Sequence, residues 1–265
     1  MSKNVLVTGC AVNIGRSIAE KFMSNGYTLI GTYCEDTRKQ ALEFQDRNPL
    51  ATIFECDFRD DTSFSNLIST LKKYEFDVIV NNAGIITLTA EGNIQNEFFD
   101  FEISTFKDVF NCNFFAPLRL CLELKENFRK GGSIINIASG GGMRAAYGSI
   151  SYSASKAALI NLTTSLSNSF YPFKQIRVNS ISPGWVNPDE QSGMHVEKGT
   201  PGSKAAKLVA MGRNASTHEI ADVAYYLTTP EASFINGTNI VVDGGWMNHN
   251  VIYYEEATGK NILNI

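Results

Sequence analysis

Short apolar runs alternate with helix-length amphipathic segments along most of this chain. The runs expected to form strands are Val5–Val7, Tyr27–Tyr33, Ala51–Cys56, Val78–Val80, Ser133–Ala138, Ile176–Ile181 and Ile240–Val242. Strands that are continuously apolar and separated by helices are typical of a parallel sheet buried on both faces. We therefore predict an α/β fold, a single doubly wound Rossmann-like domain over residues 1–265, with about seven parallel strands and helices on both faces.

The segments between these runs have the apolar spacing of helices. Helices are predicted over Ile14–Asn25, Thr37–Arg47, Asp61–Lys73, Ser104–Lys130 and Ser151–Tyr171, the fourth with a kink at Pro117. Two segments depart from the alternation. Residues 187–214 are rich in Gly, Pro and polar residues, and we expect an inserted substrate lid there. Residues 247–265 form a tail past the last strand, and its apolar residues are expected to pack on a neighbouring subunit.

Composition narrows the function classes. The 265 residues are 43% hydrophobic, which is ample for a buried core. The formal net charge of -4 argues against nucleic acid as a partner, because phosphate binding needs a basic face. No apolar run reaches the roughly 18 residues of a membrane-spanning helix, and the first apolar run is too short for a signal sequence. The five cysteines form no CxxC pair, so we expect reduced thiols in a cytoplasmic protein and no metal site.

The stretch TGCAVNIGR, from Thr8 to Arg16, follows the first expected strand. Such a turn places the unpaired N–H groups of a helix N-terminus at the sheet edge where ligands bind. Gly9 and Gly15 suit a phosphate loop. Asn13 stands where a third glycine is expected, and asparagine is the non-glycine residue that best tolerates left-handed backbone. These residues alone fit either a nucleotide-binding loop or an ordinary strand–helix turn, and Arg16 is expected to face outward.

A second group of residues contains side chains suited to acid–base chemistry. In YSASK, Tyr152 and Lys156 are four residues apart and therefore share one helix face. A nearby ammonium stabilises phenolate, so Lys156 is expected to lower the pKa of Tyr152 from its usual value of about 10. Ser139 ends the fifth strand at the ligand edge, where its hydroxyl can hold a substrate oxygen. The structural alternatives are a helix-surface pair and a turn serine.

Together these stretches resemble the compact branch of the short-chain dehydrogenase/reductase family. The resemblance covers most of the chain and rests on TGCAVNIG at Thr8–Gly15, CDF at Cys56–Phe58, NNAG at Asn81–Gly84, Asn113 in NCNFFAP, Ser139 in INIAS, Tyr152 and Lys156 in YSASK, RVNSISPGWV at Arg177–Val186 and INGTNIVVDGGW at Ile235–Trp246. It implies an NAD(P)-dependent oxidoreductase that moves a hydride between a nicotinamide cofactor and the CH–OH group of a small-molecule alcohol or ketone. Such a substrate is a hydroxy or keto compound, 3-oxoacyl and sugar-like compounds included. A homo-oligomer, tetramer or dimer, is implied as well.

The resemblance implies four catalytic residues, Asn113, Ser139, Tyr152 and Lys156. Tyr152 would be the general acid in reduction and the base in oxidation, while Ser139 would polarise the substrate oxygen. Lys156 would bind the nicotinamide ribose, and Asn113 would anchor a water that relays protons from Lys156 to solvent.

The implied cofactor contacts follow the ends of successive strands: Gly9, Asn13, Ile14 and Gly15 at the pyrophosphate; Tyr33 at the second strand; Asp57 and Phe58 at the adenine; Asn82, Ala83 and Gly84 at the adenosine ribose; Tyr152 and Lys156; and Pro183, Gly184 and Val186 at the nicotinamide. Members that prefer NAD usually end the second strand with Asp, where this chain has Tyr33 and then Cys34. Glu35 and Asp36 would repel a 2′-phosphate, whereas Arg38 or Lys39 are close enough in sequence to reach one. NAD or NADP both fit, with a slight preference for NAD.

The substrate contacts are expected to come from Ser139, Arg144, Trp185 and His195. Arg144 and His195 are either anchors for an anionic substrate or solvated loop charges. Two other functions stay open at this point. One is a non-catalytic NAD(P)-binding regulator or scaffold. The other is an epimerase or dehydratase of the same superfamily, which usually has a larger C-terminal substrate domain than this chain offers.

Overall fold

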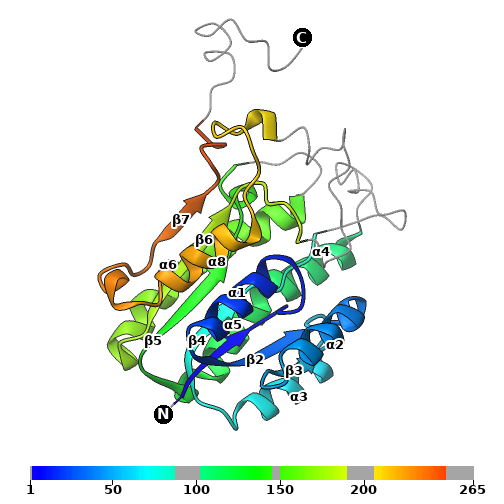
Figure 1. The fold of residues 1–265 in the computed structure, drawn as a ribbon, viewed down its shortest axis with the longest axis vertical. Coiled ribbons are helices and arrows are strands. Elements are labelled where there is room, and N and C mark those ends of the chain that lie inside the picture. The colour runs from blue at the N-terminus through cyan, green and yellow to red at the C-terminus, as the bar shows by residue number, and fades with distance from the viewer. Residues whose placement is uncertain (1, 87–101, 145–149, 190–205, 249–265) are drawn as a thin grey trace, which may run out of the picture.

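Seven parallel strands form one sheet in the order β3-β2-β1-β4-β5-β6-β7 (Figure 1). The computed structural model describes residues 2–86, 102–144, 150–189 and 206–248. The strands are β1 (Lys3–Val7), β2 (Tyr27–Tyr33), β3 (Thr52–Glu55), β4 (Phe76–Asn81), β5 (Phe128–Ile137), β6 (Arg177–Pro183) and β7 (Asn239–Val242). The predicted α/β fold with a parallel sheet is confirmed.

Helices cover both faces of the sheet. They are α1 (Asn13–Ser24), α2 (Arg38–Arg47), α3 (Asp61–Leu71), α4 (Ile103–Phe110), α5 (Ala116–Glu123), α6 (Ile150–Lys174) and α8 (Thr217–Tyr226). Because side chains alternate along a strand, Val5 and Val7 pack with Phe22 of α1, Phe44 of α2 and residues of α8. Leu6 points to the other face, where α3, α5 and α6 cover the sheet. Each strand is therefore apolar on both sides, which explains its continuous apolar sequence.

The strand order places a crevice at the carboxyl edge of the sheet. From β1, the chain winds first through β2 to β3 and then returns to β4 on the other side of β1. The connections after β1 and β4 leave the sheet in opposite directions at this point, which opens a space between them. The loops that follow β1, β4 and β5 carry Gly9, Asn82 and Ser139 to this edge.

The predicted helix over Ser104–Lys130 is confirmed as helical up to Glu123, but it is not one continuous α-helix and its last residues are wrong. Helix α4 ends at Phe110, a π-helical turn spans Asn111–Phe115, and α5 begins there with Pro117 in its first turn. Pro117 does not kink a helix interior, because an N–H in the first turn needs no partner within the helix. Strand β5 begins at Phe128, so Arg129 and Lys130 belong to the sheet and not to a helix.

Helix α8 was not predicted from the sequence. Its N-terminus has a capping box, in which the Ser216 hydroxyl accepts from the Glu219 N–H and the Glu219 carboxylate accepts from the Ser216 N–H. Ile220, Ala221 and Ala224 are buried, and they hold α8 beside α1 (Figure 1). The motif STHE at 216–219 was a local signal for this helix.

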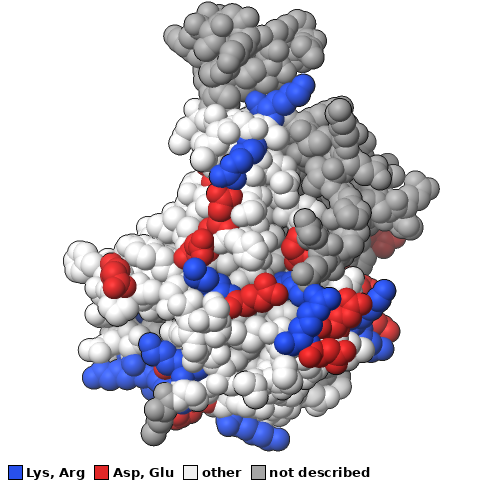
Figure 2. Space-filling model, viewed as in Figure 1, with Lys and Arg blue, Asp and Glu red and all other residues white. Residues whose placement is uncertain are grey.

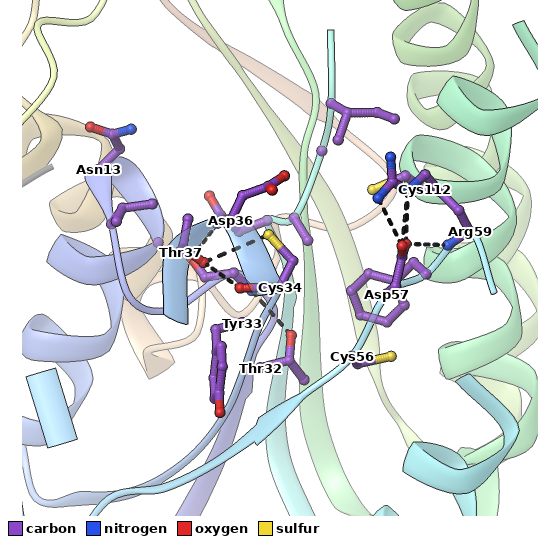
Figure 3. Close-up of a pocket in the computed structure, with 18 of the residues that line it drawn as sticks. Asn13, Thr32, Tyr33, Cys34, Asp36, Thr37, Cys56, Asp57, Arg59 and Cys112 are labelled. Carbon is purple, nitrogen blue, oxygen red and sulfur yellow. Dashed lines mark hydrogen bonds and ion pairs between the residues drawn. The ribbon is translucent and has the colours of Figure 1, made fainter. Parts of the chain in front are cut away.

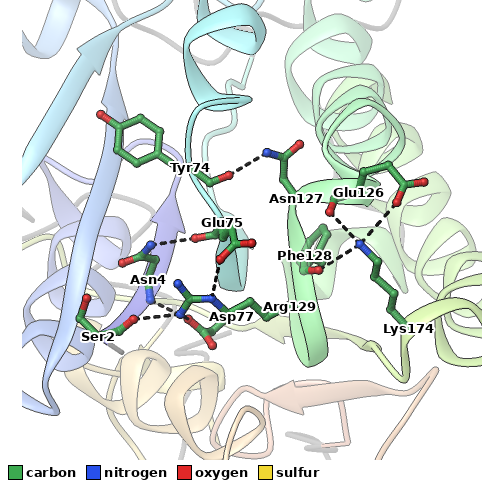
Figure 4. A network of polar contacts seen from close by, with 10 residues as sticks. All are labelled: Ser2, Asn4, Tyr74, Glu75, Asp77, Glu126, Asn127, Phe128, Arg129 and Lys174. Carbon is green, nitrogen blue, oxygen red and sulfur yellow. Dashed lines mark hydrogen bonds and ion pairs between the residues drawn. The ribbon is translucent and has the colours of Figure 1, made fainter.

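A polar network closes the amino edge of the sheet, opposite the crevice (Figure 4). Arg129 at the start of β5 contacts Asp77 at 3.0 Å and Glu75 at 3.2 Å. The same Asp77 carboxylate accepts from the backbone N–H of Asn4 in β1 at 2.7 Å. At the end of α6, Lys174 donates to the Glu126 carbonyl at 2.7 Å. The polar side chains at this edge therefore hold strands and helix ends together, and we expect ligands at the opposite, carboxyl edge.

Acidic and basic side chains are interspersed on the face shown in Figure 2, so the described residues there form no continuous basic patch. Among the described residues, no helix is both long and apolar enough to cross a membrane. The five cysteines are free thiols, four of them buried, and the described residues hold no cluster of metal-ligating side chains.

Candidate functional site

A cavity of about 300 Å³ opens at the carboxyl ends of β1 to β4 (Figure 3). It is lined by Gly9, Val12, Asn13, Ile14, Gly15, Thr32, Tyr33, Cys34, Asp36, Thr37, Cys56, Asp57, Phe58, Arg59, Asn82, Ala83, Gly84, Ile85 and Cys112. The cavity thus brings together the residues predicted to hold the pyrophosphate, the adenine and the adenosine ribose.

The loop after β1 has the backbone geometry expected from its sequence. Gly9 has φ +66 and Asn13 has φ 51, so the prediction that Asn13 supplies a left-handed residue is confirmed. A β-carbon on Gly15 would collide with the Gly9 carbonyl oxygen and the Asn82 amide nitrogen. Only glycine therefore allows the start of α1 to approach the chain after β4 this closely. The Asn13 Oδ1 accepts from the Asp189 N–H at 3.2 Å, which ties this loop to the chain that follows β6.

The outer part of this cavity has charged side chains on both sides. Asp36 lies on one side of it, and Asp57 and Arg59 lie on the other (Figure 3). The Arg59 guanidinium holds the Asp57 carboxylate through Nε at 2.9 Å and Nη2 at 2.8 Å, which lowers the pKa of Asp57. Arg38 is bound to Glu55 at 2.6 and 2.9 Å and does not line the cavity. No role was predicted for Arg59 from the sequence.

A second cavity, of about 290 Å³, continues along the sheet edge toward β5 and β6. It shares Ile14, Asn82 and Gly84 with the first cavity. Its other lining residues are Ile137, Ala138, Ser139, Tyr152, Lys156, Pro183, Gly184 and Val186. A ligand that extends from the first cavity into the second therefore reaches Ser139, Tyr152 and Lys156.

Tyr152 and Ser139 are hydrogen-bonded to each other through their side chains. The Ser139 hydroxyl also accepts from the Gly141 N–H at 3.1 Å, which fixes its orientation at the end of β5. Burial raises the pKa of Tyr152, and the hydrogen bond from Ser139 offsets this only in part. The phenol is therefore held in its neutral form at physiological pH.

The expected lowering of the Tyr152 pKa by Lys156 is wrong for this structure. The Lys156 ammonium is buried, donates to the Ile137 carbonyl at 2.8 Å and lies 5.7 Å from the Tyr152 ring centroid. Burial lowers the pKa of Lys156 itself to about 8. Desolvation is thus the largest effect on both groups, and sequence spacing alone does not reveal how deeply a pair is buried.

Asn113 lies in the π-helical turn, with its side chain completely buried. Its Oδ1 accepts from the Ile85 N–H at 2.8 Å, and its Nδ2 donates to the Ile85 carbonyl at 2.9 Å and to the Ser155 hydroxyl at 3.0 Å. A β-carbon on Gly84 would lie 3.2 Å from both Asn113 Oδ1 and Lys156 Nζ. The asparagine therefore joins the loop after β4 to the helix that carries Tyr152.

The chain after β4 is fixed in turn by Thr8. The Thr8 hydroxyl accepts from the N–H groups of Asn82 and Ala83, both at 2.9 Å. The Asn82 side chain donates to the Thr8 carbonyl at 2.9 Å and the Gly9 carbonyl at 3.2 Å. The NNAG stretch thus braces the sheet edge at the same time as it lines both cavities.

Of the predicted substrate residues, Ser139 lines the second cavity, Arg144 and Trp185 do not, and His195 is outside the described residues. Trp185 follows Gly184 and has 37% of its surface exposed. Most of the predicted lid, residues 190–205, and the tail from residue 249 are also outside the described residues. Asn187 accepts from the Asn214 side chain at 2.9 Å, so the two ends of the insert are held together.

The expectation that Arg16 faces outward is wrong. The side chain is only 5% exposed as a residue and lies between α1 and α2, with its guanidinium carbon 5.6 Å from the Phe44 ring centroid. Its Nε donates to Glu20 at 2.9 Å, one helical turn along. The buried guanidinium is thus paired with the partly exposed carboxylate of Glu20.

Comparison with known proteins decides the family. A family profile described as enoyl-(acyl carrier protein) reductase matches residues 9–247. The chain belongs to the short-chain dehydrogenase/reductase family. Among the family's proteins, it is 33% identical to oxidoreductase UcpA of Salmonella typhimurium over 260 residues, which covers 92% of this chain and 94% of that protein. Family and fold make the chain an oxidoreductase of this type.

Solved structures of the family have the same fold over most of the chain. A 4-hydroxyisoleucine dehydrogenase complexed with NADH has a TM-score of 0.82 at 26% identity, covering 94% of this chain and 100% of that one. BdcA in complex with NADPH has a TM-score of 0.79 at 27% identity, covering 91% of this chain and 93% of that one. The two complexes contain different dinucleotides, so similarity of fold does not decide between the two cofactors.

Proposed function

We propose that this protein is an NAD(P)-dependent oxidoreductase that interconverts a small-molecule alcohol and the corresponding ketone. The observation that carries the proposal is the hydrogen-bonded Ser139–Tyr152 pair above the buried Lys156, in a cavity continuous with a glycine-turn cavity at the start of α1. Related structures of the family hold NADH or NADPH.

The residues present fit a dinucleotide. Gly15 lets α1 start directly against Gly9 and Asn82, and Gly84 leaves room beside Asn113 and Lys156. The N–H groups in the first turn of α1 are then free for a pyrophosphate. Asp57 and Phe58 would hold the adenine, and Pro183, Gly184 and Val186 the nicotinamide. When bound, the nicotinamide dinucleotide donates or accepts the hydride.

The chain's own residues supply the proton. Tyr152 is held neutral by burial, so its hydroxyl can donate to the substrate oxygen during reduction. The Ser139 hydroxyl positions that oxygen next to the phenol. Lys156, with a pKa of about 8, exchanges its own proton near neutral pH and can restore the proton that Tyr152 gives up. The hydrogens of the Asn113 amide are used by Ile85 and Ser155, so we propose that it shapes the proton path and that its side chain does not itself bind the relay water.

Replacing Tyr152 with phenylalanine tests this assignment. The variant keeps the ring but lacks the proton, and a positioned acid–base group contributes about 10²–10⁴-fold to the rate. We expect kcat for ketone reduction to fall by that factor while NADH affinity, measured by fluorescence titration, is unchanged. Retention of most activity would refute the role of Tyr152. If the native protein binds NADH but turns over nothing in a broad panel of ketones and alcohols, the chain is a nucleotide-binding regulator instead.

We further propose that NAD is preferred over NADP. Asp36 lines the adenosine end of the first cavity, and the nearby arginines are already held, Arg59 by Asp57 and Arg38 by Glu55. A 2′-phosphate would therefore meet a carboxylate and no uncommitted cation among the residues that line this cavity. Replacing Asp36 with asparagine is expected to raise NADPH affinity relative to NADH about 5–30-fold, the size of a repulsion of about 1–2 kcal/mol between charges near the surface.

Glu35→Gln is the matched control, because Glu35 is the exposed neighbour that does not line the cavity. Fluorescence titration with NADH and NADPH measures both ratios. An equal response of the two variants would show that Asp36 has no specific part in the preference.

We also propose that the protein acts as a cytoplasmic homo-oligomer. Free thiols fit a reducing compartment. Large apolar side chains are exposed on helices that flank the site, among them Leu122 of α5 and Phe173 of α6, with 49% and 47% of their surfaces accessible. Light scattering on a sizing column gives the number of subunits, and a monomer at micromolar concentration would contradict the proposal.

A further inference from the structure

Arg144 differs from most other arginines of the described part of the chain. Ion pairs hold six of them: Arg16, Arg38, Arg59, Arg119, Arg129 and Arg213. Arg144 has no carboxylate partner among the described residues and lies instead over the Trp246 ring, 5.6 Å from guanidinium carbon to ring centroid. Arg144 is also exposed, so within the described part of the chain its guanidinium is open to an anion.

The turn after β5 brings Arg144 back toward Ser139. The Arg144 N–H donates to the Gly140 carbonyl at 3.1 Å, so the chain between them closes into a single tight turn. A β-carbon on Gly140 would lie 3.0 Å from Trp246 Cζ3, so the indole stands directly against the residue that follows Ser139. Trp246 therefore packs against the residue after Ser139 and also lies under the guanidinium of Arg144.

The Trp246 side chain is held in place by its own loop. The two carboxylate oxygens of Asp243 accept from the N–H groups of Gly245 and Met247, each at 2.8 Å. The Trp185 ring packs edge-on against Trp246 with centroids 6.4 Å apart. Asp243, the acidic residue of this loop, is thus engaged with backbone and does not neutralise Arg144.

We propose that Arg144 binds an oxyanion on the substrate, so that the substrate is a ketone or alcohol that also carries a carboxylate or phosphate. This inference rests on the proposed function, because it places the reacting oxygen at Ser139 and Tyr152. The planar guanidinium offers paired N–H donors that match the two oxygens of such a group. The faces of Trp185 and Trp246 then cover the carbons between the two polar ends.

The kinetic test compares acids with neutral partners of the same shape. The substrates are 2-, 3- and 4-oxopentanoate and the corresponding oxopentanamides, together with dihydroxyacetone phosphate and dihydroxyacetone. The variants are Arg144→Gln and Arg144→Lys. The control is Lys130→Gln, which removes the same charge from an exposed residue in the amino-terminal half of β5.

The native protein is expected to favour at least one acid over its neutral partner in kcat/KM. Arg144→Gln should remove about 10–100-fold of that preference, mainly through KM, because a hydrogen bond to a charged group is worth about 1.5–3 kcal/mol. Arg144→Lys should retain part of it, and Lys130→Gln all of it. Whether the carboxylate or the phosphate pair shows the effect identifies the anion. Equal losses for acid and neutral partner in Arg144→Gln would overturn the proposal.

A binding test separates this inference from the proposed activity. The chain has two tryptophans, and both lie at this site, so intrinsic fluorescence reports on it directly. Titration of the NAD⁺-saturated protein with 3-hydroxybutanoate or inorganic phosphate is expected to change the emission of the native protein and of Lys130→Gln, but not that of Arg144→Gln. A saturable response that survives in Arg144→Gln refutes the anion site even if the protein proves to be an active reductase. If the response depends on Arg144 but no ketone is turned over, the anion site stands and the oxidoreductase proposal fails.

Discussion

Replacing Lys156 with methionine is expected to stabilise the folded protein, although this lysine lies at the centre of the proposed site. The ammonium is buried, and among the described residues its hydrogen-bond partner is the Ile137 carbonyl at 2.8 Å. A charge taken out of water in this way destabilises the fold unless it is fully compensated. Methionine keeps a similar length and flexibility and carries no charge.

The magnitude follows from the pKa. Lowering the pKa of Lys156 from 10.5 to about 8 corresponds to about 3 kcal/mol of destabilisation of the charged form. Removing the lysine also leaves the Ile137 carbonyl without its donor, which costs about 1–2 kcal/mol. The net gain is therefore about 1–2 kcal/mol at pH 7, or about 2–8 °C in Tm for a chain of this size.

The sign of the pH dependence provides the decisive measurement. Below pH 8 both the folded and the unfolded native protein carry the proton on Lys156, so the full destabilisation is present. Between about pH 8 and 10.5 the folded form releases the proton first, and the native protein gains stability relative to the variant. The difference in Tm between Lys156→Met and the native protein should shrink across this window.

Thermal unfolding by circular dichroism at pH 7, 8, 9 and 10 measures this difference. Lys130→Met is the matched control, because it removes an exposed ammonium from β5 and should show no change of the difference across the same window. A Lys156→Met variant that is less stable than the native protein at pH 7 would refute the reasoning. So would a stability difference that stays constant from pH 7 to pH 10.

Three further predictions concern the turns that build the site. Asn13→Ala is expected to cost about 1–2 kcal/mol in urea unfolding, because an ordinary residue resists the φ of 51, whereas Asn13→Gly should change stability by less than about 1 kcal/mol; equal losses would contradict the role of backbone geometry. Gly15→Ala is expected to weaken NADH binding in a fluorescence titration at least tenfold, because its β-carbon would collide with Gly9 and Asn82; native affinity would show that the loop can relax. Ser216→Ala should lower stability in thermal unfolding by about 0.5–2 kcal/mol through loss of the N-cap of α8, and an unchanged Tm would show that the cap contributes little.

The sheet was predictable because its strands are buried on both faces. Runs such as Tyr27–Tyr33 need no alternation, and the prediction for that strand matches β2 residue for residue. The exception is β5, whose first residues Phe128 to Gly132 include Arg129 and Lys130. These residues lie at the amino edge, where the polar network replaces the apolar core, so their sequence does not look like that of an inner strand.

The helices were predictable where their boundary signals were read. The capping box formed by Ser216 and Glu219 marks the start of α8, but no helix was predicted for this segment. The break between α4 and α5 was harder, because the π-helical turn Asn111–Phe115 keeps the chain helical and only adds a residue to one turn. Pro117 signalled a discontinuity, but its place in a first turn follows only from the three-dimensional structure.

The members of the candidate site were predictable from their place after successive strands, because the carboxyl ends of parallel strands meet at one edge. Their electrostatics were not. The positions of Tyr152 and Lys156 on one helix face are set by spacing, but their pKa values are set by depth below the surface. The depth depends on Ile137 and Asn113, which come from distant parts of the chain.

This dependence suggests why a single lysine can be kept charged in the core of the site. Asn113 fixes Ile85 and Ser155, Gly84 leaves room for the ammonium, and the end of β5 supplies the accepting carbonyl. Each of these contacts comes from a different element, and none compensates the charge completely. A site with this arrangement holds an ammonium whose pKa is close to neutral. Burial of the charge destabilises the fold, and the Lys156→Met variant should recover that free energy. The same free energy lowers the pKa of the lysine into the pH range where it can pass a proton to Tyr152.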